Sequence, residues 1–185
     1  WQGYLHKTGL VAEHMLVNVL IRAKELAGKG EELFAGTSLK YFLYNQIDQD
    51  NFTEETLEMF SKLDDYDILS AIKEWTNHED KVLSLLSQMI VDRKLLRVEI
   101  QKDTFEVEQI NKKINKFSKK LNLTKEETNY FVFSQEIKNQ AYNSEKPIFI
   151  LNKKGKLKDI AKASDQFNIQ ALTKPVIKHF ICYPK

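Results

Sequence analysis

The sequence has little of what disulfides, cysteine-based metal sites and membrane spans require. Cys182 is the only cysteine in 185 residues, so an intrachain disulfide and a cysteine-based zinc site are both excluded. No apolar run approaches the roughly 18 residues that a membrane-spanning helix needs. The net charge is only +2, so no overall field directs the chain toward nucleic acid or a membrane surface. These features predict a reducing, cytoplasmic setting without a membrane partner.

Catalytic sequence motifs are missing as well. The chain contains no P-loop, no nucleophile elbow and no Gly-x-Gly-x-x-Gly turn. His78 is followed by Glu79 and Asp80, but these residues lie between two predicted helices and have no second histidine nearby. A turn with a helix cap is therefore a better interpretation than a metal site. We expect no catalytic residue and no bound metal in this chain.

The composition is that of a globular protein, with 42% hydrophobic and 29% charged residues. Apolar side chains recur at helical spacing through the first half, which predicts about five helices. Gly28 and Gly30 end the first of them, as glycine commonly does beyond a helix C-terminus. The predicted helices lie at 5–27, at 38–43 behind a cap from Thr37 or Ser38, at 53–63, at 64–75 and, after a turn at 77–80, at 82–90.

The pattern changes after Arg93, where short β-like runs replace helical spacing. We predict a mainly α fold followed by a small α+β lobe, with three or four strands in an antiparallel or mixed sheet and one long helix. The corresponding domains are 1–94 and 95–185. The predicted elements of the lobe are strands at 95–101, 130–137, 147–151 and 176–183, a long helix at 105–121, a turn at 152–156 around Gly155 and a short helix at 160–167.

The long predicted helix carries a lysine face opposite its apolar stripe. Phe105 and Phe117 fall on the apolar stripe and do not interleave with the lysines, so a solvated face is the simpler interpretation. A non-catalytic α+β module that binds nucleic acid or protein remains an alternative, although we do not expect nucleic acid as the partner. The lysines of this face are Lys112, Lys113, Lys116, Lys119 and Lys120.

A polar cluster at Tyr4, His6 and Lys7 precedes the first apolar helix. At about 100° per residue, Tyr4 and His6 would point to nearly opposite sides of a helix, with Lys7 on the arc between them. Tyrosine can stack on a sugar or base, lysine can pair with a phosphate, and histidine can donate a hydrogen bond. The ordinary alternative is that Tyr4 packs, His6 caps the helix and Lys7 is solvated.

Several stretches together resemble HD-domain phosphohydrolases of the deoxynucleoside-triphosphate triphosphohydrolase type. YLHKTGLVAEHMLVNVLIRA resembles the Tyr-x-His-Lys helix that follows the catalytic core in that family, and DRKLLRVEI resembles the passage into its C-terminal sheet. YFVFSQEI and HFICYPK are similar to parts of the terminal lobe of the SAM-and-HD-domain enzyme and its bacterial relatives. The resemblance covers most of the chain.

The resemblance implies roles for individual residues. Tyr4 and Lys7 would contact the substrate nucleotide, and His6 and Lys7 would contact an effector nucleotide together with Lys146 of the terminal lobe. Leu5 stands where the animal enzyme has a base-reading glutamine, which leaves base recognition at that position in doubt.

The chain departs from the family in one respect, because none of its four histidines is followed by aspartate. In the family, a histidine, a His-Asp pair and a later aspartate bind the divalent metal, Mg²⁺, Mn²⁺ or similar, upstream of the Tyr-x-His-Lys segment. We therefore expect a C-terminal piece of a nucleotide phosphohydrolase that acts on dNTPs, inactive by itself. We expect it to supply the substrate-site wall, a regulatory lobe and the contacts of a homo-oligomer, a dimer or tetramer.

Overall fold

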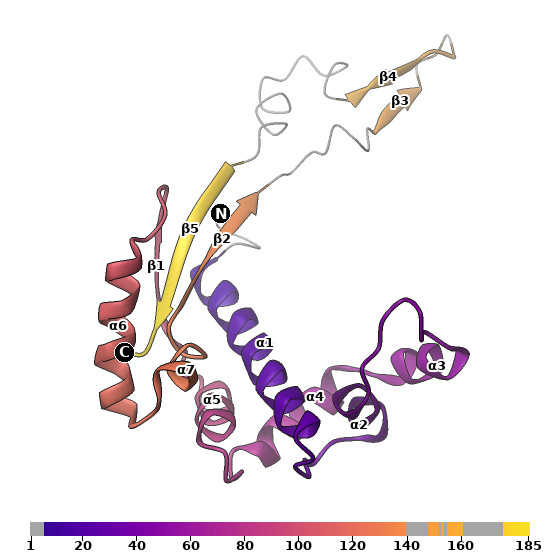
Figure 1. Ribbon diagram of the computed structural model, residues 1–185. Helices are drawn as coiled ribbons and strands as arrows, with labels where there is room; N and C mark the ends of the chain where they lie inside the picture. The colour runs from indigo at the N-terminus through magenta and orange to yellow at the C-terminus, as the bar shows by residue number, and fades with distance from the viewer. Residues whose placement is uncertain (1–5, 140–147, 152, 154, 161–175) are drawn as a thin grey trace. The chain divides into compact units, whose positions relative to one another are not determined.

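The computed structural model describes residues 6–139, 148–151, 153, 155–160 and 176–185 (Figure 1). It confirms the predicted fold class, a mainly helical chain followed by a small α+β lobe. Within these ranges the helices are α1 Lys7–Gly28, α2 Thr37–Tyr44, α3 Glu54–Lys62, α4 Asp65–Trp75, α5 Lys81–Val91, α6 Val107–Leu121 and α7 Lys125–Thr128. The strands are β1 Arg97–Gln101, β2 Phe133–Asn139, β3 Phe149–Leu151, β4 Leu157–Asp159 and β5 Val176–Tyr183.

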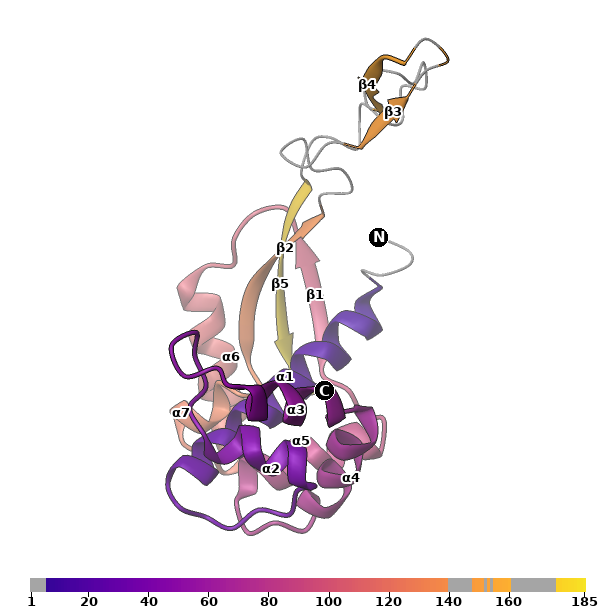
Figure 2. The same ribbon diagram turned by 90° about the vertical axis from the view of Figure 1, so that its right-hand side faces the viewer.

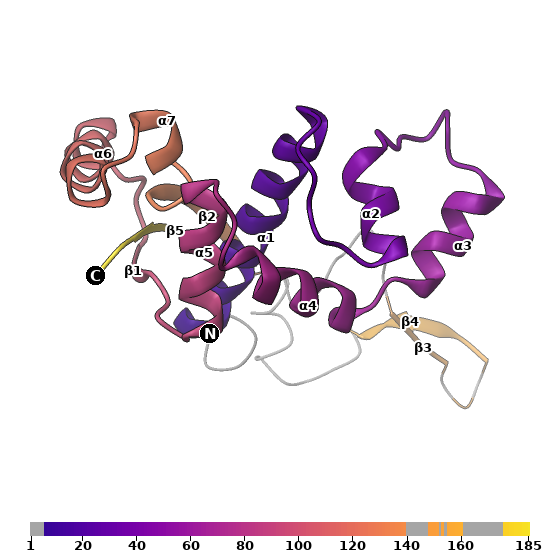
Figure 3. The same cartoon turned by 90° about the horizontal axis from the view of Figure 1, so that it is seen from below.

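The chain divides into two compact units. The first contains residues 1–98, 111–133 and 182–185, and the second contains residues 99–110 and 134–181. In the first unit, α1 packs against α2 and α5, and α4 packs against α5 and α2 (Figure 3). The first unit therefore has its core where α1 and α5 meet.

Helix α1 owes its position to an unbroken apolar stripe. Val11, Met15, Val19 and Ala23 follow one another at every fourth position, so they share one face, and each is at most 2% exposed. The Met15 Sδ atom also lies 3.4 Å from the backbone nitrogen of Leu96, which donates to it. Burying this stripe fixes α1 along its length, and with it the position of its first turn.

Side-chain caps begin several of the helices. Thr53 starts α3 and Asp64 starts α4, each in a reciprocal capping box. The expected cap of α2 by Thr37 or Ser38 is wrong, because the helix begins behind Gly36 and both residues lie inside it. Glycine suits this position because a Cβ there would collide with the Asp67 carboxylate of the α4 capping box.

Strand β5 lies between β1 and β2 in a three-stranded antiparallel sheet (Figure 2). Its residues Phe180, Ile181 and Cys182 are fully buried. Burial raises the pKa of the Cys182 thiol to about 12. Strand β5 confirms the strand predicted at 176–183. Strand β1 confirms the strand predicted at 95–101, although it begins two residues later, at Arg97.

The predicted strand at 130–137 is partly wrong, because β2 begins at Phe133. The backbone N–H groups of Phe131 and Val132 both donate to Thr128 O at 2.9 Å, which continues the turn after α7. Three of the eight predicted positions therefore belong to a turn. Of the helix predicted at 160–167, all but Ile160 lies outside the described residues.

Strands β3 and β4 form a separate antiparallel hairpin, with Phe149 opposite Asp159 and Leu151 opposite Leu157. Gly155 has a φ of 74°, a left-handed conformation that glycine adopts without strain. The predicted turn around Gly155 is confirmed. Within the described part of the chain, no helix has both the length and the hydropathy required to cross a bilayer.

Candidate functional site

The structure describes two of the four residues proposed for nucleotide binding. Tyr4 and Lys146 lie outside the described residues. His6 is the N-cap of α1, and its Nδ1 atom accepts a hydrogen bond from Thr8 N at 3.3 Å. The expectation that Tyr4 and His6 point to opposite sides assumed that His6 lies within a helix. His6 has an extended backbone and α1 begins at Lys7, so that assumption does not hold. The neutral His6 ring then carries its proton on Nε2, which remains a donor.

Lys7 lines a cleft in the first unit with a volume of about 190 Å³. The start of α1 forms one side of it, and the segment that leads from α5 into β1 forms the other. Three of its lining side chains are cationic and none is acidic. The lining residues are Lys7, Thr8, Val11, Arg93, Leu95, Leu96, Val98 and Lys185.

The electrostatics of the cleft favour an anion. Lys7, Arg93 and Lys185 each bring a positive charge. The N-terminal end of a helix adds the positive end of its dipole, and the first turn of α1 contains no acidic residue to offset it. Leu95, Leu96 and Val98 supply an apolar wall. A small cleft of this kind can hold a phosphate group beside a less polar part of the same ligand.

Arg93 reaches the cleft through an unusual backbone conformation. Its φ is 57°, and the Arg93 and Lys94 N–H groups donate to Ile90 O and Met89 O at 3.1 Å and 2.8 Å. This is a Schellman ending of α5, in which glycine is the usual residue. The corresponding position after α6 is Asn122, a common substitute with a φ of 52°. Arginine at such a position is strained, which is more frequent at functional sites than elsewhere.

Arg93 and Lys185 were missed as site residues in the sequence. The signal for Arg93 was present, since it is the first of the two arginines in the DRKLLRVEI stretch. Its pairing with Lys7 depends on how the end of α5 packs beside the start of α1, which no local pattern encodes. Lys185 is the last residue of the HFICYPK stretch, but nothing in that stretch singled it out as a binding residue.

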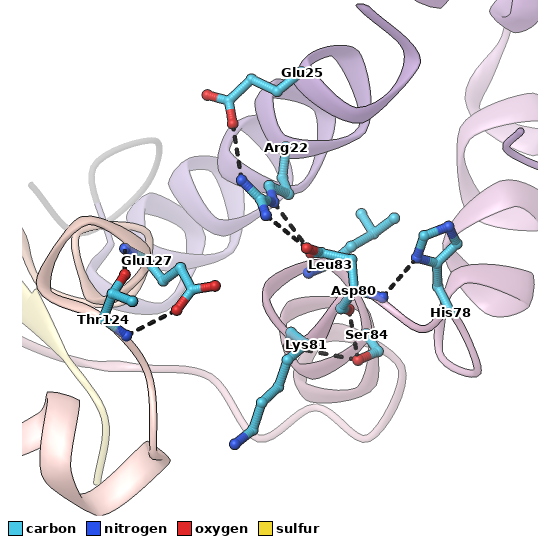
Figure 4. Close-up of polar contacts among 9 residues, drawn as sticks. All are labelled: Arg22, Glu25, His78, Asp80, Lys81, Leu83, Ser84, Thr124 and Glu127. Carbon is cyan, nitrogen blue, oxygen red and sulfur yellow. Dashed lines mark hydrogen bonds and ion pairs between the residues drawn. The ribbon is translucent and has the colours of Figure 1, made fainter. Parts of the chain in front are cut away.

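A second polar cluster joins α1 to α5, and it is structural (Figure 4). Arg22 donates from Nε and Nη2 to the two Asp80 carboxylate oxygens at 3.1 Å and 2.6 Å, and both side chains are 13% exposed. Asp80 also caps α5 by accepting from Leu83 N at 2.8 Å. Its partners are protein groups that orient the two helices, so the cluster binds no ligand in our interpretation.

Charge pairing changes the pKa values of this cluster. Burial of the Asp80 carboxyl acts to raise its pKa, but the hydrogen bonds from Arg22 and Leu83 and the Arg22 charge outweigh that effect and hold it below its ordinary value. The hydrogen bond to Asp80 raises the pKa of Arg22. The pair is therefore ionised throughout the neutral range.

The turn role predicted for His78 is confirmed, since its Nδ1 atom accepts from Asp80 N at 3.0 Å (Figure 4). Among the described residues, no three or more His, Cys, Asp or Glu side chains are placed together to hold a metal ion.

The lysine face of α6 is partly engaged with the chain itself. Lys113 Nζ lies 3.5 Å from the centre of the Tyr183 ring, and Lys120 donates to Lys185 O at 2.7 Å. Lys116 lies over the ring of Phe117. The Lys113 and Lys120 contacts connect this face to Tyr183 of β5 and to Lys185 beyond it, and no observation favours the face as a nucleic-acid surface.

The comparison with solved structures gives a match along the whole chain. A crystal structure of a phosphohydrolase from Bacteroides thetaiotaomicron VPI-5482 is 43% identical, covers 100% of this chain and superposes with a TM-score of 0.86. The chain is thus similar to a phosphohydrolase over its full length. It corresponds to 47% of that phosphohydrolase.

Among the curated proteins, the uncharacterized protein YwfO of Bacillus subtilis (strain 168) is 32% identical over 97 residues. That alignment covers 52% of this chain and 21% of YwfO. No family model matches the chain. The chain spans less than half of each of these two relatives.

Proposed function

We propose that this chain is part of a metal-dependent, HD-type phosphohydrolase that acts on nucleotides, with deoxynucleoside triphosphates as the substrate class. Its own contribution is a wall of a nucleotide site, in which Lys7, Arg93 and Lys185 pair with phosphate and His6 donates from Nε2. The observation that carries the proposal is the cationic cleft at the start of α1, found in a chain that is 43% identical throughout to a phosphohydrolase.

The charge of the cleft supports phosphate over other ligand chemistries. The lining residues include three cations and no acidic side chain. They would repel a cationic ligand, and a neutral sugar would give them no charge to pair with. Lysine acts as a point charge and arginine as a planar fork, and together they suit a flexible polyphosphate.

The divalent metal of such an enzyme does not fit the described residues, because they offer no converging set of ligands. We assign it to another part of the parent protein and derive no chemical step through it here. The role of this chain is to bind and orient the nucleotide.

The binding test uses calorimetric titration of the chain with dATP and with inorganic triphosphate in metal-free buffer. We expect Lys7→Ala to weaken binding about tenfold, as the loss of one charge-assisted contact should. Lys125→Ala is the matched control, because Lys125 is also an exposed first residue of a helix but does not line the cleft. Equal affinity of the two variants for dATP and triphosphate would contradict binding of the phosphates at this cleft.

The activity test compares the parent protein with this chain on a dNTP panel with Mg²⁺ or Mn²⁺, measuring released triphosphate and phosphate. We expect hydrolysis by the parent and none by this chain. An inactive parent would contradict the proposal. Activity in this chain alone would mean that the chemistry lies among its own residues.

A further inference from the structure

Helix α6 contacts the last residues of the chain through three side chains of one face. Lys113, Phe117 and Lys120 are spaced by four and then three residues, so they lie one above the other along the helix. We call these three residues the α6 contact row. Tyr183 and Lys185, which the row contacts, belong to the first unit together with the row itself. The contacts between them therefore lie within one compact unit.

Tyr183 is held at the end of β5 by two members of the contact row. The centres of the Phe117 and Tyr183 rings are 5.9 Å apart, within the range of favourable aromatic pairs. Lys113 Nζ lies 3.5 Å from the centre of the Tyr183 ring, which is a cation–π contact. Phe117 and Tyr183 are only 4% and 9% exposed. The chain is thus fixed at Tyr183.

Lys120 holds the chain again two residues later. Its Nζ donates to the backbone oxygen of Lys185 at 2.7 Å, a length typical of a hydrogen bond from a charged donor. Pro184 lies between the two held residues, and its ring fixes its φ at about −65°. Few backbone torsions of this short segment remain free, so the Cα atom of Lys185 has little freedom to move.

This restraint matters because Lys185 lines the α1 cleft, whereas Lys120 does not. A ligand that recruits a free chain end has to order both its backbone and its side chain, and both steps oppose binding. A backbone that is already held leaves only the side chain to be ordered. Preorganisation of this kind raises affinity without any new contact to the ligand.

We propose that Lys120 is a positioning residue for the phosphate site. It holds the backbone of Lys185 so that the Lys185 side chain is available to an anion in the α1 cleft. This inference rests on the proposed function, because it requires a phosphate ligand at that cleft. It gives a role in binding to one lysine of the face that the sequence predicted to be solvated.

The first test measures the affinity for inorganic triphosphate by calorimetric titration in metal-free buffer. Lys120→Met keeps an unbranched side chain beside the Phe117 ring and removes the donor, so we expect binding to weaken about fivefold. Lys120→Arg keeps a cationic donor and should stay within about twofold of the wild type. Lys119→Met is the matched control, because Lys119 is the exposed neighbour of Lys120 on α6 and does not line the cleft. It removes the same charge and should bind as the wild type does.

A double-mutant cycle shows whether Lys120 acts through Lys185. We expect Lys185→Ala alone to weaken triphosphate binding about tenfold, since it removes a charge-assisted contact. Once that side chain is absent its position no longer matters, so adding Lys120→Met should cause no further loss. Additive losses contradict the positioning role. Equal affinity of Lys120→Met and Lys119→Met contradicts it as well.

Backbone dynamics provide a readout that needs no ligand. The order parameter of the Lys185 amide, measured by NMR relaxation, should stay above about 0.6 in the wild type and in Lys120→Arg and fall below that value in Lys120→Met. The denaturation midpoint of Lys120→Met should equal that of the wild type, because the hydrogen bond that it removes is exposed. An order parameter that Lys120→Met leaves unchanged contradicts the inference.

The inference and the proposed function fail in different ways. A wild-type chain that binds no triphosphate contradicts the proposed function, and the role of Lys120 in phosphate binding with it. Triphosphate binding that weakens in Lys7→Ala and Lys185→Ala but not in Lys120→Met contradicts the positioning role alone and leaves the cleft as the phosphate site.

Discussion

Arg93 places a long cationic side chain at a backbone position that glycine usually fills. The left-handed conformation costs a non-glycine residue roughly 1 kcal/mol. Arg93 occupies this position although glycine, or asparagine as at Asn122, would end the helix with less backbone strain. Arg93 lines the cleft at the start of α1, and a positive charge beside that cleft is the benefit that the geometry suggests.

Replacing Arg93 with glycine therefore separates stability from binding. We expect Arg93→Gly to raise the free energy of unfolding by about 0.5–1 kcal/mol, since it relieves the strained φ. We expect the same variant to bind triphosphate about tenfold more weakly, since it removes one of three cations. Urea unfolding and calorimetry measure the two effects. A variant that is less stable, or that binds equally well, would contradict this account of Arg93.

Cys182 is chemically protected by its place in β5. It is fully buried and its thiol pKa is raised to about 12, so almost no thiolate forms at neutral pH. We expect the native chain to react with a thiol reagent at least about 100-fold more slowly than the chain unfolded in guanidinium. Absorbance of the released chromophore gives both rates. Rapid native labelling would mean that the end of β5 opens readily.

At the scale of elements, Asp80 performs two tasks for two helices. It caps α5 and pairs with Arg22 of α1 through two hydrogen bonds. Removing one partner of a largely buried pair leaves the other charge uncompensated, which costs more than the loss of a surface ion pair.

Two substitutions distinguish the tasks. We expect Asp80→Asn to lower the free energy of unfolding by about 2 kcal/mol, because it keeps a capping oxygen and loses the charge. We expect Asp80→Ala to lower it by about 1 kcal/mol more, because the cap is lost as well. Glu58→Gln, which breaks the exposed Lys62 pair, should leave the denaturation midpoint unchanged. Equal effects of the three changes would contradict the assignment.

Helices and strands of the chain could largely be predicted from spacing and turn chemistry. Periodicity gave the positions of α1 and β5, and Gly155 located the hairpin turn. Errors arose where a backbone hydrogen bond decided the outcome, as at Phe131 and Val132, or where a cap was a glycine, as at Gly36. The cleft could not be predicted from the sequence, because Lys7, Arg93 and Lys185 are far apart in the chain. Only the packing of the folded chain brings them to the same cleft.

At the scale of the whole molecule, the stability should depend on pH through His14. Burial lowers the pKa of His14, outweighing the nearby Glu13 charge, so the unfolded chain binds this proton more readily than the folded chain does. A histidine with a depressed pKa contributes stability that is present above the unfolded pKa of 6.5 and decreases as the pH falls below it.

The measurement is urea unfolding between pH 7.5 and 5. We expect the free energy of unfolding to decrease as the pH falls through 6.5 toward the lowered pKa of His14, and His14→Gln to reduce that slope. A slope identical in the variant would assign the dependence to other groups. The Asp80 pair contributes a separate loss only below 3.8, because the pKa of that carboxyl is lowered from there.

The middle strand of the three-stranded sheet is also the one that is synthesised last. Strand β5 begins at Val176, whereas its neighbours β1 and β2 end at Gln101 and Asn139. On the ribosome, β1 and β2 have no partner until β5 has left the exit tunnel, so the sheet closes only after synthesis of this region is nearly complete. Pairing over such sequence distances is slow, and unpaired edges attract other chains in the meantime. Until the sheet is completed, the edges of β1 and β2 are therefore the part of a nascent chain most open to pairing with another chain.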